Sequence, residues 1–182
     1  MVNMTQVRTG SPLTRADLDA MPDDGRRHEL IDGVLVVTPA PSPTHQRVLA
    51  RLHLQLAPGC PRHLEILFAP LDVALADDTV MQPDLLVARR EDFTSHDLPV
   101  APLLAVEILS PSTRRFDLMT KRSRYEAAGT ASYWVIDPDL LTLTAWDLVD
   151  GRYVEVAHVA GEEAYAATSP FPVSVVPARL RD

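Results

Sequence analysis

The chain has 182 residues, of which 46% are hydrophobic and 23% are charged, and its formal net charge is −8 at pH 7. This length and composition are typical of one globular domain with a sizeable core. The negative charge argues against a protein that coats nucleic acid non-specifically, because such proteins are normally basic. It does not exclude a nuclease, whose metal site is itself acidic and whose contacts with DNA are local.

Cysteine content and hydropathy narrow the class further. Cys60 is the only cysteine, which excludes an internal disulfide and a zinc site of the CxxC type. No apolar run approaches the roughly 18 residues that a membrane span requires, and residues 1–12 lack the apolar centre of a secretory signal. We therefore expect a cytoplasmic protein that makes no contact with a membrane.

The first predicted element is a short helix that follows an amino-terminal arm. Residues 1–13 are expected to be flexible. Thr14 and Asp17, three residues apart, resemble a capping box, in which each side chain accepts a hydrogen bond from the other residue's backbone. This pattern predicts a helix over residues 14–21 and the start of a single domain that extends to residue 182.

A hairpin and a second helix are predicted next. Asp32-Gly33 lies between two apolar runs, and such a pair favours the positive φ angles of a tight hairpin turn. We therefore predict a β-hairpin over residues 28–37. Apolar residues at helical spacing then predict an amphipathic helix over residues 44–57.

The rest of the chain is predicted to be mostly extended, with one long helix. Residues 89–101 are polar and are expected to form an exposed loop. The helix is expected over residues 117–128, where Gly129 would end it. Apolar runs bounded by turn residues predict strands at 63–76 (interrupted near Pro70), 81–89, 102–109, 132–137, 140–148, 152–159 and 171–176.

The order of these elements predicts an α/β or α+β fold with a mixed central sheet flanked by helices. Strand 103–109, helix 117–128 and strand 132–137 form a βαβ succession, so the two strands are expected to be parallel neighbours.

Two carboxylates stand near the ends of predicted strands. Asp84 opens the apolar run of strand 81–89, and Glu107 closes the run of strand 102–109. An acidic side chain within an apolar strand is costly unless a cation meets it. Carboxylates at this position, together with the backbone carbonyl of Ile108, are suitable ligands for Mg²⁺. The alternative is that each acid caps a turn or pairs with an arginine.

A lysine and a third carboxylate extend this set. Lys121 on the predicted helix is suited to orient or deprotonate a water molecule near a metal; its alternative role is a surface pair with Asp117. Glu29 on the predicted hairpin is either a third acidic neighbour of the metal or a partner of Arg26 or Arg27.

Other familiar catalytic motifs are absent from the sequence. It contains no HExxH zinc motif, no glycine-rich phosphate loop and no GxSxG elbow, which argues against metalloprotease, P-loop and serine-hydrolase chemistry. His45 and His53 fall on the predicted helix 44–57 and are expected at its surface.

Five segments carry a family resemblance. HELIDG, QPDLLV, AVEILSPST, RFDLMTKRSRYEAAG and YWVIDP occur in this order. Together they resemble the Uma family of restriction-endonuclease-like proteins, which is placed in the PD-(D/E)XK nuclease superfamily. The resemblance covers roughly residues 14–160 and implies a restriction-endonuclease-like fold. Ser132 is a departure, because many similar sequences have a glutamate before the tyrosine-tryptophan pair.

The resemblance also implies roles for individual residues. Asp84, which a proline precedes, matches the first acid of the superfamily motif, and Glu107 matches the second acid. Glu29 matches the acid that an early element provides. The superfamily lysine usually stands two residues after the second acid, where this chain has Leu109. In similar proteins the lysine is displaced to the following helix, and Lys121 occupies that position.

The function implied is hydrolysis of DNA phosphodiester bonds by an endonuclease that uses Mg²⁺ or Mn²⁺. Asp84, Glu107 and the Ile108 carbonyl would hold the metal. Lys121 would position or activate the attacking water, and Glu29 would hold a second metal or a metal-bound water.

DNA contacts and two rival functions complete the expectations. The protein is expected to act as a homodimer if it cuts both strands. One rival is an inactive nuclease-fold protein that binds nucleic acid or serves in assembly. The other is general acid–base catalysis on a sugar, which leaves Lys121 without a role.

The residues expected to face the phosphate backbone are Arg114, Arg115, Arg122 and Arg124.

Overall fold

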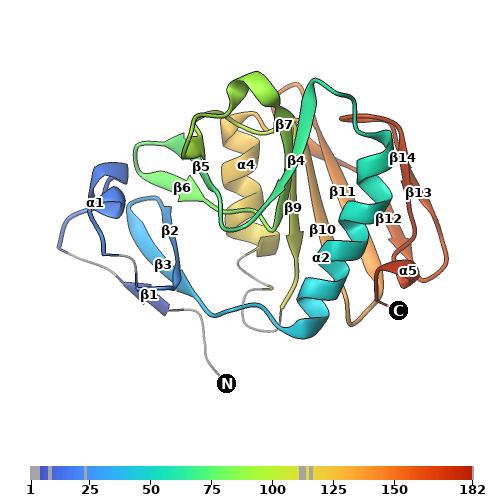
Figure 1. Cartoon of the computed structure of the whole chain (residues 1–182), viewed down its shortest axis with the longest axis horizontal. Helices are drawn as coiled ribbons and strands as arrows, with labels where there is room; N and C mark the ends of the chain where they lie inside the picture. The colour runs from blue at the N-terminus through green and yellow to red at the C-terminus, as the bar shows by residue number, and fades with distance from the viewer. Residues whose placement is uncertain (1–4, 8–9, 23, 111–113, 115–116, 182) are drawn as a thin grey trace.

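The computed structural model describes residues 5–7, 10–22, 24–110, 114 and 117–181 (Figure 1). Its strands form two six-stranded sheets and one two-stranded sheet. The first sheet, here called the hairpin sheet, contains β1 (Thr5–Val7), β2 (Arg27–Ile31), β3 (Val34–Thr38), β5 (Asp72–Ala76), β6 (Thr79–Met81) and β8 (Asp97–Leu98). The second, here called the central sheet, contains β4 (Leu64–Phe68), β7 (Leu85–Arg89), β9 (Leu104–Ile108), β10 (Ser132–Asp137), β11 (Thr142–Val149) and β12 (Arg152–Ala160). The small sheet contains β13 (Tyr165–Ala167) and β14 (Val173–Val175).

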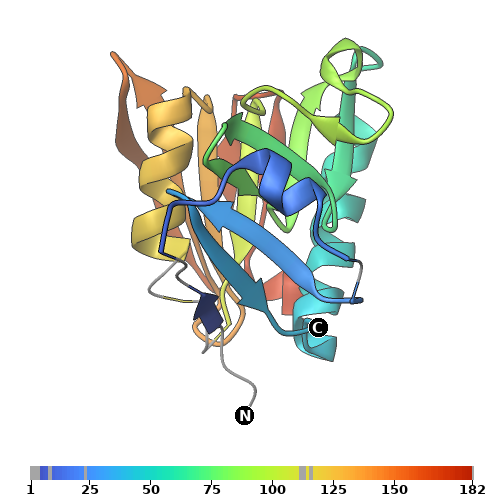
Figure 2. The same ribbon diagram turned by 90° about the vertical axis from the view of Figure 1, so that its left-hand side faces the viewer.

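The helices pack mainly against the central sheet. Figure 2 shows this sheet between α2 on one side and α4 on the other, with the hairpin sheet beside α4. The strand order is β12-β11-β10-β9-β7-β4 in the central sheet and β1-β3-β2-β6-β5-β8 in the hairpin sheet. The helical segments are α1 (Arg15–Asp19), α2 (Pro43–Leu56), η1 (Ala57–Gly59), η2 (Arg90–Asp92), the π-helical turn η3 (Asp117–Lys121), α4 (Arg122–Ala128) and α5 (Ala178–Arg181). None of the helices in the described part of the chain is long and apolar enough to cross a membrane.

Strand β9 separates two cores because its side chains alternate between the two faces of the sheet. Val106 and Ile108 pack in the core that contains α2. Ala105 and Leu109 pack in the core that contains Tyr125 of α4. Glu107 lies between Ala105 and Leu109 in the sequence, so the alternation directs its side chain toward the α4 face of the sheet. This face meets the hairpin sheet at Glu107.

The predicted βαβ unit is confirmed. Strands β9 and β10 are parallel neighbours, with Glu107 opposite Val135. The helical segment between them starts with η3 and continues as α4, and Gly129 ends it with a φ of 85°. The connection therefore begins at the edge of the sheet where Glu107 stands and returns the chain to the opposite edge, where Ser132 of β10 lies opposite Leu104.

The amino-terminal predictions are also confirmed. The side chain of Thr14 accepts a hydrogen bond from the Asp17 N–H, and the Asp17 carboxylate accepts one from the Thr14 N–H. Asp32 and Gly33 form the hairpin turn with φ angles of 51° and 72°. A Cβ added to Gly33 would lie 2.6 Å from the Cβ of Pro12, so both the turn and this close approach require glycine.

The predicted mixed central sheet flanked by helices is confirmed, and the strands also form a second six-stranded sheet that was not predicted. The predicted strand 63–76 is divided into β4 and β5, and 81–89 into β6 and β7, with each half in a different sheet. The divisions fall at Pro70 and Pro83, which have no backbone N–H to donate to a sheet ladder. Within 89–101, which was expected to be an exposed loop, β8 is buried and pairs with β5. Residues 1–13 contain β1, which pairs with β3.

Candidate active site

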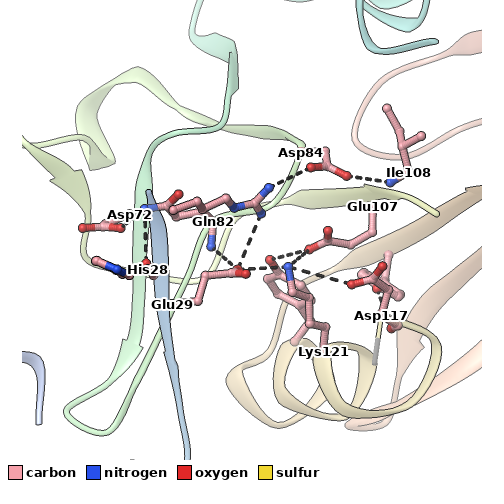
Figure 3. A network of polar contacts seen from close by, with 12 residues as sticks. His28, Glu29, Asp72, Gln82, Asp84, Glu107, Ile108, Asp117 and Lys121 are labelled. Carbon is pink, nitrogen blue, oxygen red and sulfur yellow. Dashed lines mark hydrogen bonds and ion pairs between the residues drawn. The ribbon is translucent and has the colours of Figure 1, made fainter. Parts of the chain in front are cut away.

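Four predicted site residues meet where the hairpin sheet faces the central sheet (Figure 3). Glu29 comes from β2, Asp84 from the segment before β7, Glu107 from β9 and Lys121 from the end of η3. All four line one cavity of about 230 Å³. This space holds several water molecules, each of which occupies about 30 Å³ in the liquid. The structure therefore brings together residues that lie up to 92 positions apart in the chain.

Lys121 is the cation at the centre of this cluster. Its Nζ lies 2.9 Å from Oε1 of Glu29 and 3.1 Å from Oε1 of Glu107, while Oδ1 of Asp117 is at 4.0 Å. The lysine side chain is only 3% exposed. It therefore does not form the surface pair with Asp117 that was the alternative interpretation. Lys121 is also the only lysine of the chain, since the other sixteen of its 17 basic residues are arginines.

The π-helical turn η3 gives Lys121 its position. A π turn contains one more residue than an α turn and is frequently found at functional sites. Asp117 and Lys121, at the two ends of η3, are both buried, whereas Met119 between them is exposed. The hydroxyl of Tyr133 donates to the backbone carbonyl of Asp117 at 2.8 Å and so anchors the start of this turn to β10.

Asp84 is held by three donors. Its Oδ1 accepts from Arg27 at 3.0 Å. Its Oδ2 lies 3.0 Å from Nε2 of His45 and accepts the backbone N–H of Ile108 at 2.8 Å. The Ile108 hydrogen bond places Asp84 beside the residue that follows Glu107, so the two acids of the predicted motif are neighbours.

Arg27 and His45 were not predicted as site residues. The side chain of His45 is only 12% exposed, so the expectation of a helix-surface position was wrong for this residue. Arg27 stands two positions before Glu29 on β2, and strand alternation places both on one face; this signal was available in the sequence. His45 reaches the site because Ser42 caps α2 and its first turn lies beside Asp84, and no local pattern indicates that proximity.

Glu29 is fully buried, and only one of its two carboxylate oxygens has a hydrogen-bond partner among the described residues. Its Oε1 accepts the backbone N–H of Gln82 at 2.8 Å, contacts Lys121, and lies 3.6 Å from Arg27. Its Oε2 has no hydrogen-bond partner among the residues that the structure describes. A buried carboxylate oxygen beside a polar cavity is a free ligand position for a cation or a water molecule.

The pKa values of the three acids in the cluster shift in different directions. Burial by itself raises the pKa of Asp84, but the hydrogen bond from His45 and the charge of Arg27 outweigh it, and the pKa lies well below its usual range. For Glu29, the charges of Lys121 and Arg27 likewise overcome burial and lower the pKa. For Glu107, burial wins against the charge of Lys121, the nearby Asp84 carboxylate adds to it, and the pKa rises well above its usual range.

Lys121 stays charged in this environment. Burial by itself lowers its pKa, but the Glu107 and Glu29 carboxylates raise it above the ordinary value for lysine. With Glu107 protonated, Glu29 at 2.9 Å is still a carboxylate partner. Lys121 is therefore a hydrogen-bond donor and a positive charge, and it is not a proton acceptor near neutral pH.

The donor set suits a small divalent cation. Mg²⁺ binds one or two carboxylates and keeps several of its waters, which matches Asp84, Glu107 and the polar cavity beside them. Among the described residues, no group of three His, Cys, Asp or Glu side chains is arranged to hold a metal by itself. A bound ion would therefore depend on the two acids, a backbone oxygen such as that of Ile108, and water.

The predicted basic residues lie at several places, and the described ones have partners within the chain. Arg114 pairs with Asp137. Arg124 donates to Asp32 at 2.6 Å, and Arg122 lies over the ring of Trp146, 5.0 Å from its centroid. Arg115 lies outside the described residues.

Ser132 has its own partner at the other end of β10 from the site. Its hydroxyl donates to Asp147 at 2.6 Å. Ser132 is opposite Leu104 at the start of β9, whereas Glu107 is opposite Val135.

Comparison with known proteins agrees with this architecture. The model of the Uma2 family, described as "Putative restriction endonuclease", matches residues 15–179. A crystal structure of a protein from Anabaena variabilis, described as a putative nuclease belonging to DUF820, superposes with a TM-score of 0.69. It is 19% identical in sequence, and the alignment covers 93% of this chain and 97% of the other. Among curated proteins, none matches this chain significantly. Because the family match extends over nearly the whole length, the chain belongs to the Uma2 family.

Proposed function

We propose that the protein is a Mg²⁺- or Mn²⁺-dependent endonuclease that hydrolyses phosphodiester bonds in DNA. The observation that carries this proposal is the position of Lys121: the only lysine of the chain is buried between Glu29 and Glu107, in a cavity that Asp84 also lines. Lys121 comes from a helical segment, whereas the superfamily lysine usually stands two residues after the second acid. The Lys121 ammonium group nevertheless lies beside Glu107, which matches that second acid. Membership of the Uma2 family, whose description is "Putative restriction endonuclease", supports the same function.

Asp84, Glu107 and the Ile108 carbonyl are the proposed metal ligands. A bound divalent ion would act as a Lewis acid on a phosphate oxygen and would lower the pKa of a water molecule. Asp84 must release Arg27 from Oδ1 to become a ligand. Glu107 must lose the proton that its raised pKa retains, and its deprotonation adds the second negative charge to the ligand set.

Lys121 and Glu29 act on the nucleophile and on the developing charge. The Lys121 ammonium donates hydrogen bonds, so it can orient the attacking water and offset negative charge on the phosphoryl group in the transition state. It does not take the proton from that water, because its pKa is raised. Glu29 keeps Lys121 charged and presents Oε2 to a water molecule or a second metal.

DNA is the proposed substrate, and arginines are its proposed electrostatic partners. Arg114 and Arg124 are partly exposed; Arg124 pairs with the exposed Asp32, whereas Arg114 pairs with the buried Asp137. Surface ion pairs are weak, at about 0–1 kcal/mol, so a phosphate can replace Asp32 as the partner of Arg124 at little cost. Arg115 and Arg122 complete the proposed set.

The test is nicking of supercoiled plasmid by the purified protein. Nicking is expected with Mg²⁺ or Mn²⁺ and not with EDTA. Glu107→Gln and Lys121→Met should each reduce the rate by at least about a hundredfold, because each removes a group that acts on the reacting atoms. Glu91→Gln, a change to an exposed carboxylate outside the cavity, is the matched control and should leave the rate unchanged. Equal nicking by the site variants and the wild type would identify a contaminating nuclease and end the proposal.

One observation favours the alternative of a nuclease fold without catalysis. Both oxygens of Asp84 already have partners, and one of them is the charged Arg27. In an inactive protein this pair is a permanent structural contact. Isothermal titration with Mn²⁺ separates the two functions: the endonuclease binds the ion in a manner that Asp84→Asn abolishes, whereas the inactive protein shows no such binding.

A further inference from the structure

The charged groups of the acidic cavity lie below the surface of the protein. Glu29 and Glu107 are 0% and 2% exposed, and Lys121 is 2% exposed. A phosphodiester that reacts here must therefore leave the surface and enter the protein. In an intact duplex, the stacked base pairs keep the sugar-phosphate backbone at the surface of the protein. One unpaired nucleotide, in contrast, is small enough to enter the cavity.

A larger cavity of about 810 Å³ adjoins the acidic one. The two cavities share Arg27, His45, Asp84 and the segment 38–41. The volume is within the range of about 300–1,000 Å³ that is usual for pockets that bind small organic ligands. The rest of the lining includes the apolar side chains of Val37, Leu49, Ala69 and Pro70.

The junction of the two cavities carries unused hydrogen-bond donors. Arg27 gives one nitrogen to Asp84, but its Nε and its second terminal nitrogen are buried and have no hydrogen-bond partner among the described residues. Arg26 also lines the larger cavity. Arg27 also lies 3.6 Å from Glu29, and Arg26 lies 3.7 Å from Asp24. The nitrogens of Arg27 that have no hydrogen-bond partner nevertheless suit one phosphate group, because a guanidinium group donates to phosphate in a fixed fork.

We propose that the larger cavity is a nucleotide-binding subsite that takes a single unpaired nucleotide of DNA. The base lies among Val37, Leu49 and Pro70, and its phosphate is bound by Arg27 at the junction. The adjacent phosphodiester then reaches Glu107 and Lys121. A base has apolar faces and polar edges, which fits an apolar pocket with Gln46 and His45 in its wall. The inference rests on the proposed function for its choice of substrate.

Substrate preference follows from this arrangement. A base inside the cavity is neither stacked nor paired with other bases, so a duplex must first be opened, which costs free energy. Single-stranded or unpaired DNA does not bear this cost. The protein should therefore bind and cut unpaired segments in preference to a continuous duplex.

The test measures binding in EDTA, so that cleavage does not interfere. The probe is a fluorescein-labelled oligothymidylate, either single-stranded or annealed to oligoadenylate, at one fixed salt concentration because such binding depends strongly on salt. The single strand is expected to bind at least about tenfold more tightly, because a base of the duplex must be unpaired and unstacked before it can enter the cavity. Equal affinity for the duplex would overturn the subsite.

Two variants on α2 test the place of binding. Gln46→Trp puts an indole into the larger cavity and should weaken single-strand binding by about tenfold. Leu54→Trp, at a position that is 70% exposed on the same helix and outside the cavity, is the matched control and should bind like the wild type. Unchanged binding by Gln46→Trp would refute the subsite.

The two proposals fail in different ways. If the plasmid is not nicked but Gln46→Trp still weakens binding of the single strand, the endonuclease is refuted and the nucleotide subsite stands. If the plasmid is nicked but neither strand preference nor Gln46→Trp has an effect, the subsite is refuted and the endonuclease stands.

Discussion

Removal of the Lys121 ammonium is the sharpest perturbation of the buried charge cluster. In Lys121→Met, Glu29 loses its nearest cation at 2.9 Å and keeps the Gln82 N–H and Arg27 at 3.6 Å. Removal of one partner of a buried ion pair costs about 3–5 kcal/mol. Because Arg27 compensates in part, we expect about 3 kcal/mol, which corresponds to a decrease in Tm of about 6–12 °C for a domain of this size.

The assay is urea denaturation at pH 7 in EDTA, and a second variant isolates the charge. Lys121→Met/Glu29→Gln removes both the cation and the carboxylate that it neutralises, so it should recover at least half of the lost free energy of unfolding. The single variant should also regain stability as the pH falls, because Glu29 without Lys121 takes up a proton more readily in the folded protein. A loss below about 1 kcal/mol for Lys121→Met, the value of a surface pair, would refute the buried network.

Three further predictions concern titration and packing. Glu107→Gln should make the metal-free protein more stable than the wild type at pH 7 and equally stable near pH 4, since the raised folded pKa of Glu107 favours folding only while the acid is protonated. Urea titrations at both pH values measure the difference in free energy of unfolding between variant and wild type. A difference that does not widen as the pH rises would contradict the raised pKa. Because Lys121 is the only lysine, ¹⁵N-lysine labelling yields one side-chain ammonium signal, and its titration midpoint should lie above the ordinary value of about 10.4; a midpoint below that value would exclude the neighbouring carboxylates as the dominant influence. Leu52→Ala, in the core beside α2, should lower the free energy of unfolding by about 2–5 kcal/mol. Leu54→Ala, at an exposed position of the same helix, should lower it by less than about 0.5 kcal/mol. Similar losses for the two variants in chemical denaturation would show that the buried face of α2 was assigned incorrectly.

The sequence was most informative where a local pattern has one physical solution. The capping box at Thr14 and the Asp32-Gly33 turn were predicted correctly, because backbone hydrogen bonding and φ angles within a few residues decide them. The parallel pairing of β9 and β10 followed from the handedness and length of the helical connection between them. The direction of Glu107 followed from alternation along β9 once its neighbours were known to be buried.

Prediction was weaker where two elements meet that are distant in the chain. The interruption near Pro70 was predicted, but the break at Pro83 and the division into two sheets were missed, because an apolar run does not reveal which sheet each half joins. Arg27 was considered only as a partner of Glu29, although it also contacts Asp84. His45 was assigned to a helix surface, because its partner lies 39 residues away.

The sequence by itself therefore determined the acids, the lysine and the strands and helix that carry them, because residue type and periodicity are local properties. Only the tertiary structure decided what surrounds these groups. It placed Lys121 between two carboxylates, paired Asp84 with Arg27 and His45, and left a large apolar cavity beside the acidic one. The physical reason is that pKa values, ion pairs and cavities depend on distances between segments, and those distances exist only after the sheets have packed together.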